Sequence, residues 1–503
     1  MNESKQWEQD GRGGMSVTEA TGEYTLPDYL PEVKRILRVD CQVLSCQSYA
    51  TENEVEAGGA LRYSVLYTDK EGALASASLD GTYVGRVPTQ TGAKATVIPA
   101  LESASCRPLG PRHLAMKANI RLHQFATVTR TADTPIPEGC GEVETLRKVF
   151  PTSHTCYLHT GDVPLTMEFR VESGSRVMSA DARFLPREVG CEEGGMSVKG
   201  EVWISCLLTN AQGIPYTVKG KIPVEESLSD PDVGEGAQGV VTGTVREMSV
   251  TVSEGEGDAS LLVDAFLDLW GVTGENTEVS VITDLYGMSY SMTAGTAPMT
   301  SRQYVGMYTG NFTVDGSHDT AGMECRPDSR VLDARGVATV QDVRRTGEEI
   351  AVDGEVKVSC ITHGEEGYAP ANFVLPYRVR FAERNPLPED TVWQALPECI
   401  SCHARMDGDR IACECELMFT LIASRQETGH LLSDVTVDAD HPLTRECGVV
   451  KAVYLTDGDS LWSIAKRYRV SVEEIARGNS LPDEILAHPD APYLLDGIAR
   501  LVI

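Results

Sequence analysis

Four cysteines in the C-terminal part of the chain have the residue type and spacing that bind metals or exchange disulfides. Cys399 and Cys402 enclose an Ile-Ser pair, and Cys413 and Cys415 follow eleven residues later around a single Glu. Two such thiolate pairs can hold Zn²⁺, and a Cys-x-x-Cys pair can also be a redox site. In the segment CECELMF, however, strand alternation puts Cys413 and Cys415 on one face with Leu417. We therefore expect buried thiols, with a metal site and a redox pair as alternatives, and predict no metal and no cofactor.

The rest of the sequence has no signature of catalysis. The ten histidines are scattered and form no His-Glu-x-x-His motif. No glycine-rich phosphate loop joins a strand to a helix, and no Gly-x-Ser-x-Gly nucleophile elbow occurs. We expect no catalytic residues and a protein that is not an enzyme; a hydrolase ranks third, behind two binding functions.

Length and charge restrict the partners. The 503 residues suffice for three or four domains. A formal net charge of −30 argues against nucleic acid as a partner. No segment approaches the ~18 apolar residues of a membrane span, so we expect no membrane insertion. The first residues lack the basic and apolar regions of a secretory signal. We therefore expect a cytoplasmic protein whose 14 cysteines are reduced.

A pattern that occurs three times supplies the elements that would position these residues. Residues 59–72, 200–213 and 354–367 each begin and end with glycine and contain a run of alternating apolar residues before a polar turn. Period-two alternation closed by such a turn predicts a strand that enters a hairpin. The sequence therefore predicts one β-hairpin in each of three related segments.

Two further sets of positions match between the segments. Leu37, Met178 and Leu332 each lie 22 residues before the first glycine of their segment. Cys206 and Cys360 fall where the first segment has Val65, so we expect both thiols to be small apolar core residues.

The repeats lie too far apart along the chain to be solenoid units. They predict a mainly β fold with three tandem β-rich domains, each large enough for its own core. The second domain would include a mobile, acidic, glycine-rich insertion at 225–260, and 314–330 would connect into the third. The predicted divisions are a disordered tail at 1–25, repeat domains at 26–140, 141–302 and 303–440, and a small domain at 451–503.

The last fifty residues predict the order β-α-α-β. A strand at 453–455 leads to a helix with Asp459 or Ser460 as N-cap. A second helix starts at Ser471, with Glu474 at the spacing of a capping box, and 499–503 alternates as a strand. The apolar positions of the first helix recur at helical spacing: Leu461, Ile464, Ala465 and Tyr468.

These last residues resemble a LysM domain, through GDSLWSIAKRY, VSVEEIARGN and the final strand. The three repeats resemble SPOCS domains, through YLPEVKRIL at 29–37, the CQVLSC that follows, and the strand–TDKEG–strand hairpin. The whole chain is thus similar to the SPOCS-plus-LysM proteins of endospore-forming Firmicutes. That resemblance implies a scaffold or adaptor in spore coat or envelope assembly, located in the mother cell at the forespore surface.

The LysM resemblance implies a groove that binds N-acetylglucosamine polymers between the loop after the first strand and the loop after the second helix. In the spore-forming family the same domain holds a protein instead, a coat morphogenetic ATPase like stage IV sporulation protein A. The positions of this chain that match the groove are Gly458, Asp459, Ser460, Leu461, Asn479, Ser480, Leu481 and Pro482.

Two departures from the LysM pattern bear on the ligand. The usual Pro-Gly-Gln before the last strand is Asp-Gly-Ile at 496–498, and the first helix ends on Arg469 in place of glycine. With Lys466 and Arg467, Arg469 forms a basic patch that would suit an acidic protein partner. We expect Trp462 to pack against the domain's own strands and not to stack on a sugar.

We therefore expect a non-enzymatic adaptor that docks on the coat ATPase through its LysM domain. The alternative is a peptidoglycan-binding protein that reads N-acetylglucosamine polymers and uses its repeats as spacers.

Overall fold

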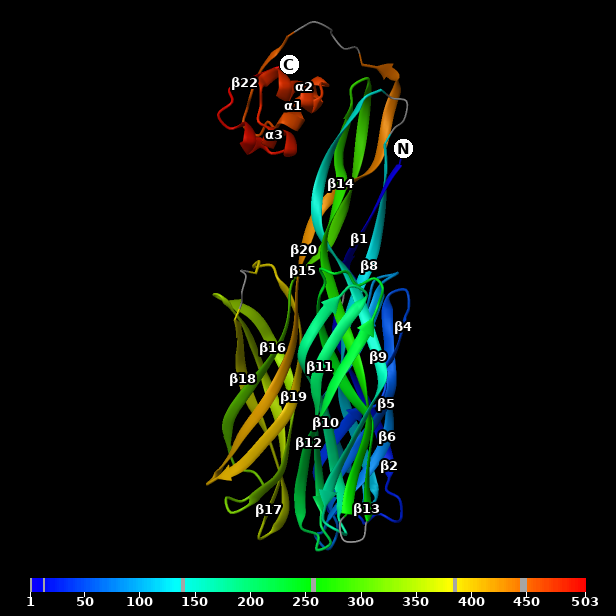
Figure 1. The fold of residues 1–503 in the computed structure, drawn as a ribbon, viewed down its shortest axis with the longest axis vertical. Coiled ribbons are helices and arrows are strands. Elements are labelled where there is room, and N and C mark those ends of the chain that lie inside the picture. Colours follow the sequence, from blue (N-terminus) through cyan, green and yellow to red (C-terminus); the bar gives the residue numbers. More distant parts are fainter. Residues whose placement is uncertain (1, 12–13, 137–140, 255–258, 383–386, 444–449) are drawn as a thin grey trace.

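The chain folds into an elongated body of antiparallel strands with a small helical module at one end (Figure 1). The computed structural model describes residues 2–11, 14–136, 141–254, 259–382, 387–443 and 450–503. The prediction of a mainly β fold is confirmed. No helix in these described ranges is both long and apolar enough to cross a membrane.

The strands form three repeats of one topology. The first contains β1 (Asn2–Asp10), β2 (Met15–Thr25), β3 (Arg35–Val43), β4 (Gln47–Ala50), β5 (Glu54–Thr68), β6 (Leu74–Pro88), β7 (Lys94–Pro108) and β8 (His113–Pro135). The second contains β9 (Val143–Val171), β10 (Arg176–Glu192), β11 (Gly195–Thr209), β12 (Pro215–Ser229), β13 (Gln238–Glu254) and β14 (Ala259–Gly287). The third contains β15 (Tyr290–Asp319), β16 (Arg330–Thr346), β17 (Glu349–Gly364), β18 (Gly367–Ala382), β19 (Val392–Asp407) and β20 (Arg410–Pro442).

Each repeat is a sandwich of two antiparallel sheets. One sheet has the order β3-β5-β6 in the first repeat, with β4 also on β5, and β10-β11-β12 and β16-β17-β18 in the others. In the second sheet the repeat's last strand pairs with the strand before it, and also with β2 in the first repeat or with the opening strand in the other two: β7-β8-β2, β13-β14-β9 and β19-β20-β15. Apolar side chains from both sheets form one core in each sandwich.

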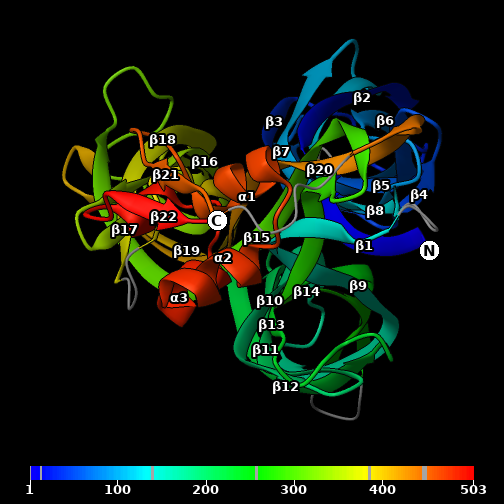
Figure 2. The ribbon, with the colours of Figure 1, turned by 90° about the horizontal axis from the view of Figure 1, so that it is seen from above.

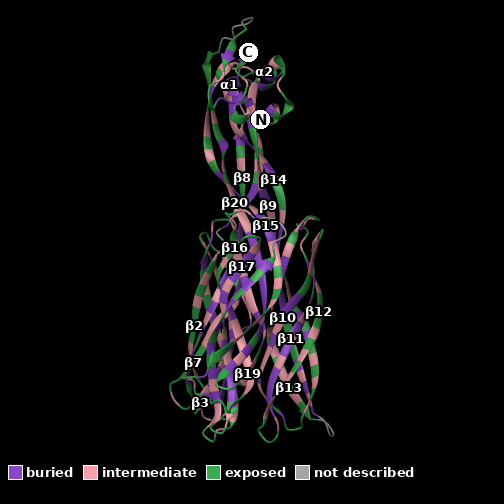
Figure 3. Ribbon diagram, turned by 90° about the vertical axis from the view of Figure 1, so that its left-hand side faces the viewer, coloured by how far each residue is buried: buried purple, intermediate pink, exposed green. Residues whose placement is uncertain are grey.

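The first and last strands of each repeat extend beyond the sandwich as a two-stranded arm. β1 pairs with the end of β8, the first half of β9 with the second half of β14, and the first half of β15 with the second half of β20. The three arms form a stalk above the sandwiches (Figures 1 and 3). Trp7, Val279, Val281, Met299 and Leu431 are buried together inside it.

The stalk corrects the prediction of a disordered tail at 1–25. Apart from residues 1, 12 and 13, which lie outside the described residues, this segment forms β1 and β2, both paired with β8. Its strands are mostly polar, and in β2 only Ala20 is buried. Their pairing depends on a partner strand that lies far along the chain, between 88 and 133 residues away, which local composition does not reveal.

Two predicted loops and one boundary are also corrected. Most of the supposed insertion at 225–260 belongs to β12, β13 and β14, and residues 255–258 lie outside the described residues. The supposed connection at 314–330 begins with the end of β15. The boundary at 302/303 lies inside β15, because that one strand supplies both the arm and the sandwich edge of the third repeat.

The glycines that define the repeats occupy equivalent points. Gly59, Gly200 and Gly354 lie in β5, β11 and β17, and a Cβ on any of them would come within 1.9 to 2.5 Å of a backbone carbonyl oxygen. Each therefore permits the same close approach of two backbones. The glycines thirteen positions later end the predicted hairpin turns with φ values of +85°, +76° and +93°: Gly72, Gly213 and Gly367.

The three sandwiches lie around a central line, where equivalent residues meet (Figure 2). The pairing of β3, β10 and β16 skips Leu37, Met178 and Leu332 at a bulge, which re-aims a side chain. All three side chains pack in one apolar cluster, together with a second equivalent set: Leu66, Leu207 and Ile361. The residues that matched in the sequence thus form the contact between the repeats.

Beside this cluster lies a group of polar and charged residues that we call the ionic hub: Arg38, Asp40, Ser179, Asp181, Asp333 and Arg335. The registers with β5, β11 and β17 show that Arg38, Ser179 and Asp333 are equivalent, as are Asp40, Asp181 and Arg335. The Arg38 guanidinium is fully buried and lies 2.8 Å from Asp333 and 3.0 Å from Asp40. It also donates to Ser179 Oγ at 3.1 Å. The Arg38 side chain of the first repeat therefore contacts the second repeat through Ser179 and the third repeat through Asp333.

Candidate functional site

The C-terminal module, residues 450–503, has the predicted βααβ order with two additions. β21 (Ala452–Tyr454) pairs with β22 (Arg500–Val502), and α1 (Leu461–Tyr468) and α2 (Val472–Asn479) lie between them. The sequence analysis did not predict α3 (Asp483–Ala487) and the 3₁₀ turn η1 (Pro492–Leu495).

Both long helices of the module begin with the predicted caps. The Ser460 hydroxyl accepts from the Ser463 backbone N–H at 3.1 Å, and the Ser463 hydroxyl accepts from that of Ser460 at 2.9 Å. The Ser471 hydroxyl accepts from the Glu474 N–H at 3.1 Å. These bonds satisfy amide groups that lack an intrahelical partner, so they fix where the two helices begin and where the first loop of the candidate groove ends.

Four of the predicted groove residues support the module's own fold. Ser460 is the cap of α1, and Leu461 is fully buried. Asp459 is buried, and bonds from Thr456 and Arg467 lower the pKa of its carboxyl. Asn479 ties α2 to the last strand, because its side chain donates to the Val502 carbonyl and accepts from the Val502 N–H, both at 2.7 Å.

The other four residues form the accessible part of the predicted groove. Gly458, Ser480 and Pro482 are exposed in the full chain, and Leu481 is half-buried. Ser480 ends α2 in a left-handed conformation with φ of +51°. These residues offer small side chains and backbone groups and no ionisable side chain, so they can bind a ligand by shape and hydrogen bonding but cannot transfer protons.

The predicted basic patch is engaged within the chain. Lys466 Nζ lies 2.6 Å from Asp284 Oδ1 of the stalk, and Arg469 donates to the Gly287 carbonyl at 3.3 Å. Arg467 pairs with Asp459 of its own module at 2.8 Å. The stalk therefore binds Lys466 and Arg469, and Asp459 binds Arg467, so each basic side chain of the patch already has an acceptor within the chain.

Trp462 belongs to the buried cluster that includes Val453 and Leu501 of the module's own strands, and it also contacts the stalk. Its indole N–H donates to Asp284 Oδ2 at 2.8 Å, and its ring meets that of Tyr286 edge to face at 5.0 Å. The Tyr286 hydroxyl donates to the Val470 carbonyl at 2.7 Å, and burial raises the pKa of this tyrosine. The sequence analysis missed Asp284 and Tyr286, because their partners lie far along the chain and no local motif marks them.

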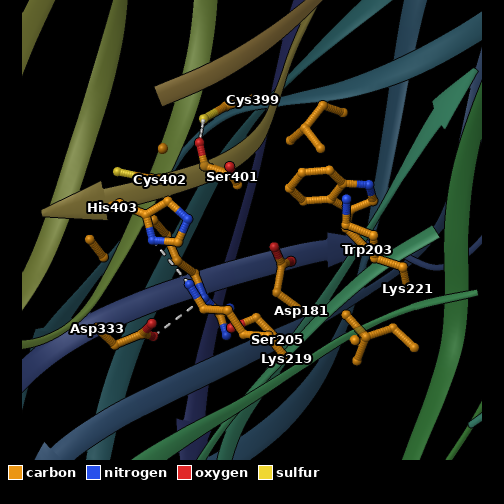
Figure 4. A pocket seen from close by; sticks show the side chains of 16 residues that line it. Asp181, Trp203, Ser205, Lys219, Lys221, Asp333, Cys399, Ser401, Cys402 and His403 are labelled. Carbon is orange, nitrogen blue, oxygen red and sulfur yellow. Dashed lines mark hydrogen bonds and ion pairs between the residues drawn. The ribbon is translucent and has the colours of Figure 1, made fainter. Parts of the chain in front are cut away.

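A cleft of about 220 Å³ between the second and third repeats is a second concave site, which the sequence analysis missed (Figure 4). Lys221 Nζ lies 3.6 Å from the centre of the Trp203 ring, and Lys219 Nζ donates to His403 Nδ1 at 3.1 Å. Burial alone would raise the pKa of Asp181, but Arg183 and Arg335 lower it to about 2.

Glu398 lies beside this cleft, and the pKa of its carboxyl is raised. Burial raises the pKa of its carboxyl to about 7, although Arg183 opposes the rise from 3.7 Å. The carboxyl therefore takes up a proton near neutral pH in the folded chain. Glu398 belongs to the third repeat and Arg183 to the second. The protonation state of the Glu398 carboxyl therefore affects the contact between these two repeats.

The four cysteines of the C-terminal part come together in the third sandwich. All four are buried, and Cys413, Cys415 and Leu417 share the inner face of β20, as predicted. The Sγ atoms of Cys402, Cys413 and Cys415 lie 3.5 to 3.6 Å apart. Cys206 and Cys360 are fully buried, as predicted for core thiols. The twelve cysteines in the described part of the chain are free thiols, and Cys140 and Cys447 lie outside it.

Comparisons with known proteins identify the C-terminal module. The family model of the LysM domain matches residues 456–486. The match includes both helices and both loops of the candidate groove. The comparison with curated proteins found no match. No solved structure matches the chain either.

Proposed function

We propose that this chain is a non-enzymatic adaptor whose repeats serve as the scaffold and whose LysM domain holds the ligand. One observation carries this proposal: α1 is bound to the stalk, while Gly458, Ser480 and Pro482 remain exposed in the loops at 458–461 and 479–482. Binding needs complementary surface and not perturbed acid–base pairs, so these loops suit a binding function.

The first candidate ligand is a coat morphogenetic protein, an ATPase like stage IV sporulation protein A. The resemblance of the repeats to SPOCS domains supports this ligand, and with it a role in spore coat assembly in the mother cell. Since the stalk engages Lys466 and Arg469, we place the protein contact on the exposed loops and not on the basic patch.

The second candidate ligand is an N-acetylglucosamine polymer such as peptidoglycan. The LysM match at 456–486 favours it, because domains of this type bind such polymers. The Asp-Gly-Ile sequence at 496–498, which replaces the usual Pro-Gly-Gln, weighs against this ligand.

Calorimetric titration of the full chain with each ligand separates the candidates. Pro482→Trp would fill the accessible loop, and Glu473→Trp on the exposed face of α2 is the matched control. We expect Pro482→Trp to weaken binding of the coat ATPase at least tenfold and Glu473→Trp to leave it unchanged. The same loss for an N-acetylglucosamine oligomer alone would establish the second ligand. If neither ligand binds the wild-type chain, the proposal is wrong.

A further inference from the structure

The thiol cluster of the third repeat has the arrangement of a metal site. Cys402, Cys413 and Cys415 form a triangle of sulfur atoms with edges of 3.5 to 3.6 Å. Thiolates bound to Zn²⁺ at ~2.3 Å in a tetrahedron lie about 3.8 Å apart. The triangle is thus close to one face of a zinc–thiolate tetrahedron, and far wider than the ~2.05 Å bond of a disulfide.

A fourth thiol lies beside the triangle. Cys399 is buried close enough to Cys415 for the two thiols to interact electrostatically, and its Sγ donates to the Ser401 carbonyl at 3.5 Å. The pairing of β19 with β20 skips Ile400 at a bulge, so Cys399 and Cys402 both turn to the inner face of the sheet. Gly336 leaves room for Cys399, because a Cβ at that position would lie 2.6 Å from its sulfur.

The other two repeats show that the fold does not require thiols at these positions. The register of β7 with β8 places Ala104, Met116 and Ala118 where the third repeat has Cys402, Cys413 and Cys415. In the second repeat the equivalent residues are apolar as well: Val250, Leu261 and Val263. Packing alone explains an isolated core thiol such as Cys206. In the third repeat, however, cysteine replaces an apolar residue at three adjoining positions, which brings three possible ligands of one metal ion together.

A metal ion would have a path to the cluster. Cys399 and Cys402 line the cleft between the second and third repeats, together with Ser401 and His403 (Figure 4). Arg183 from the second repeat is close enough to Cys399 to interact with it electrostatically. A positive side chain at this place would offset the negative charge of a zinc ion bound by four thiolates.

We propose that Cys402, Cys413 and Cys415, with Cys399 as the fourth ligand, bind one zinc ion in the third repeat. Each thiol loses its proton to water as its sulfur–zinc bond forms, so no oxidant or reductant takes part. All four protein ligands together would close the coordination shell, as in a structural site. The zinc ion would join β19 to β20 inside the core of the sandwich.

Elemental analysis of the full chain, purified under reducing conditions with zinc supplied, tests this site. Cys402→Ala and Cys415→Ala reproduce the residues of the first repeat, which already fit this sheet, so these variants should fold. Cys206→Ala, which removes a buried thiol outside the cluster, is the control. We expect about one zinc ion per wild-type and control chain, and a loss of at least tenfold in the two cluster variants.

Cobalt provides a second measurement. Co²⁺ bound to the wild-type chain should give sulfur-to-metal charge-transfer absorption that both cluster variants lack. Wild-type protein without stoichiometric zinc, or variants that keep it, would overturn the proposal. A protein mass lower by two hydrogen atoms, with two of the cluster cysteines resistant to alkylation, would also overturn it in favour of a disulfide.

Discussion

The contact among the three repeats and the contact between the LysM domain and the stalk hold the molecule together in different ways. Among the repeats, six apolar side chains and the six residues of the ionic hub meet around one central line; half of these residues are buried and none is exposed. At the LysM domain, a few side chains of α1 meet Asp284, Tyr286 and Gly287 at the edge of the stalk. A buried charge network is costly to disrupt, whereas half-exposed ion pairs contribute little each. We infer that the three repeats form a rigid scaffold, and that the LysM domain can detach from the stalk while this scaffold stays folded.

The largest effect is expected from Arg38→Ala in the ionic hub. Removal of this guanidinium leaves the Asp333 side chain, which is only 9% exposed, with Arg335 at 3.9 Å as its remaining ion-pair partner. We expect the free energy of unfolding to fall by roughly 3–5 kcal/mol, the cost of an uncompensated buried charge. Denaturant unfolding measures this change. Arg62→Ala, which breaks the exposed pair with Asp80, should cost less than ~1 kcal/mol. Equal losses in the two variants would show that the hub does not hold the repeats together.

Glu398→Gln should remove a pH-dependent part of the repeat contact. The folded pKa of about 7 lies above the ordinary value of 4.5, so the folded chain binds this proton more tightly than the unfolded chain. The resulting stability is fully present below about pH 4.5 and is lost as the pH rises through about 7. The difference between wild type and Glu398→Gln should therefore change by up to about 3 kcal/mol across this window. Unfolding measured at several pH values, with the exposed Glu414→Gln as control, tests this; a flat difference would contradict it.

Asp284→Ala should release the LysM domain without unfolding the scaffold. The substitution removes the acceptor of both Trp462 and Lys466, and such contacts contribute roughly 1–3 kcal/mol to a docked state. Hydrogen–deuterium exchange should rise in α1 and at 284–287, while the melting temperature of the repeats stays unchanged. Asp434→Ala, an exposed stalk residue, should alter neither. Unchanged exchange in Asp284→Ala would mean that other contacts suffice to dock the domain.

The smallest effect concerns the two left-handed helix ends of the LysM domain. Ser480 and Arg469 both have positive φ, at +51° and +57°, where glycine avoids a steric cost. Ser480→Gly should therefore stabilise the domain by about 0.5–1 kcal/mol. Arg469→Gly should gain less, because it also loses the bond to the Gly287 carbonyl. The two melting temperatures compare the effects directly, and an equal gain would show that the Arg469 bond contributes nothing to docking.

The sequence was most informative where a feature repeats or is local. The glycines at 59, 200 and 354 and the period-two alternation after them predicted three equivalent hairpins. The caps Ser460 and Ser471 predicted the starts of both LysM helices, because capping depends on residues within one turn. Leu37, Met178 and Leu332 matched in position, although the sequence did not show that they would meet.

Features that combine different residue types across long separations were missed. The equivalent hub positions hold Arg38, Ser179 and Asp333, so a comparison of the repeats shows no shared chemistry there. β1 was missed because its partner is the end of β8. The basic patch was identified in sequence, but its acceptor Asp284 belongs to another repeat. Tertiary pairing of this kind leaves no local signal.

The pairing of each repeat's first strand with its last strand determines the path of the chain through the scaffold. Every repeat begins at the tip of the stalk, descends through its sandwich, and returns to the same tip. An added or removed repeat would therefore leave both ends of the scaffold in place, so duplication of this unit can proceed without rerouting the chain. The same path delivers the residues after β20 to the stalk tip, where the LysM domain lies (Figure 1). Its distance from the base of the scaffold is thus set by the length of the arms and not by the linker.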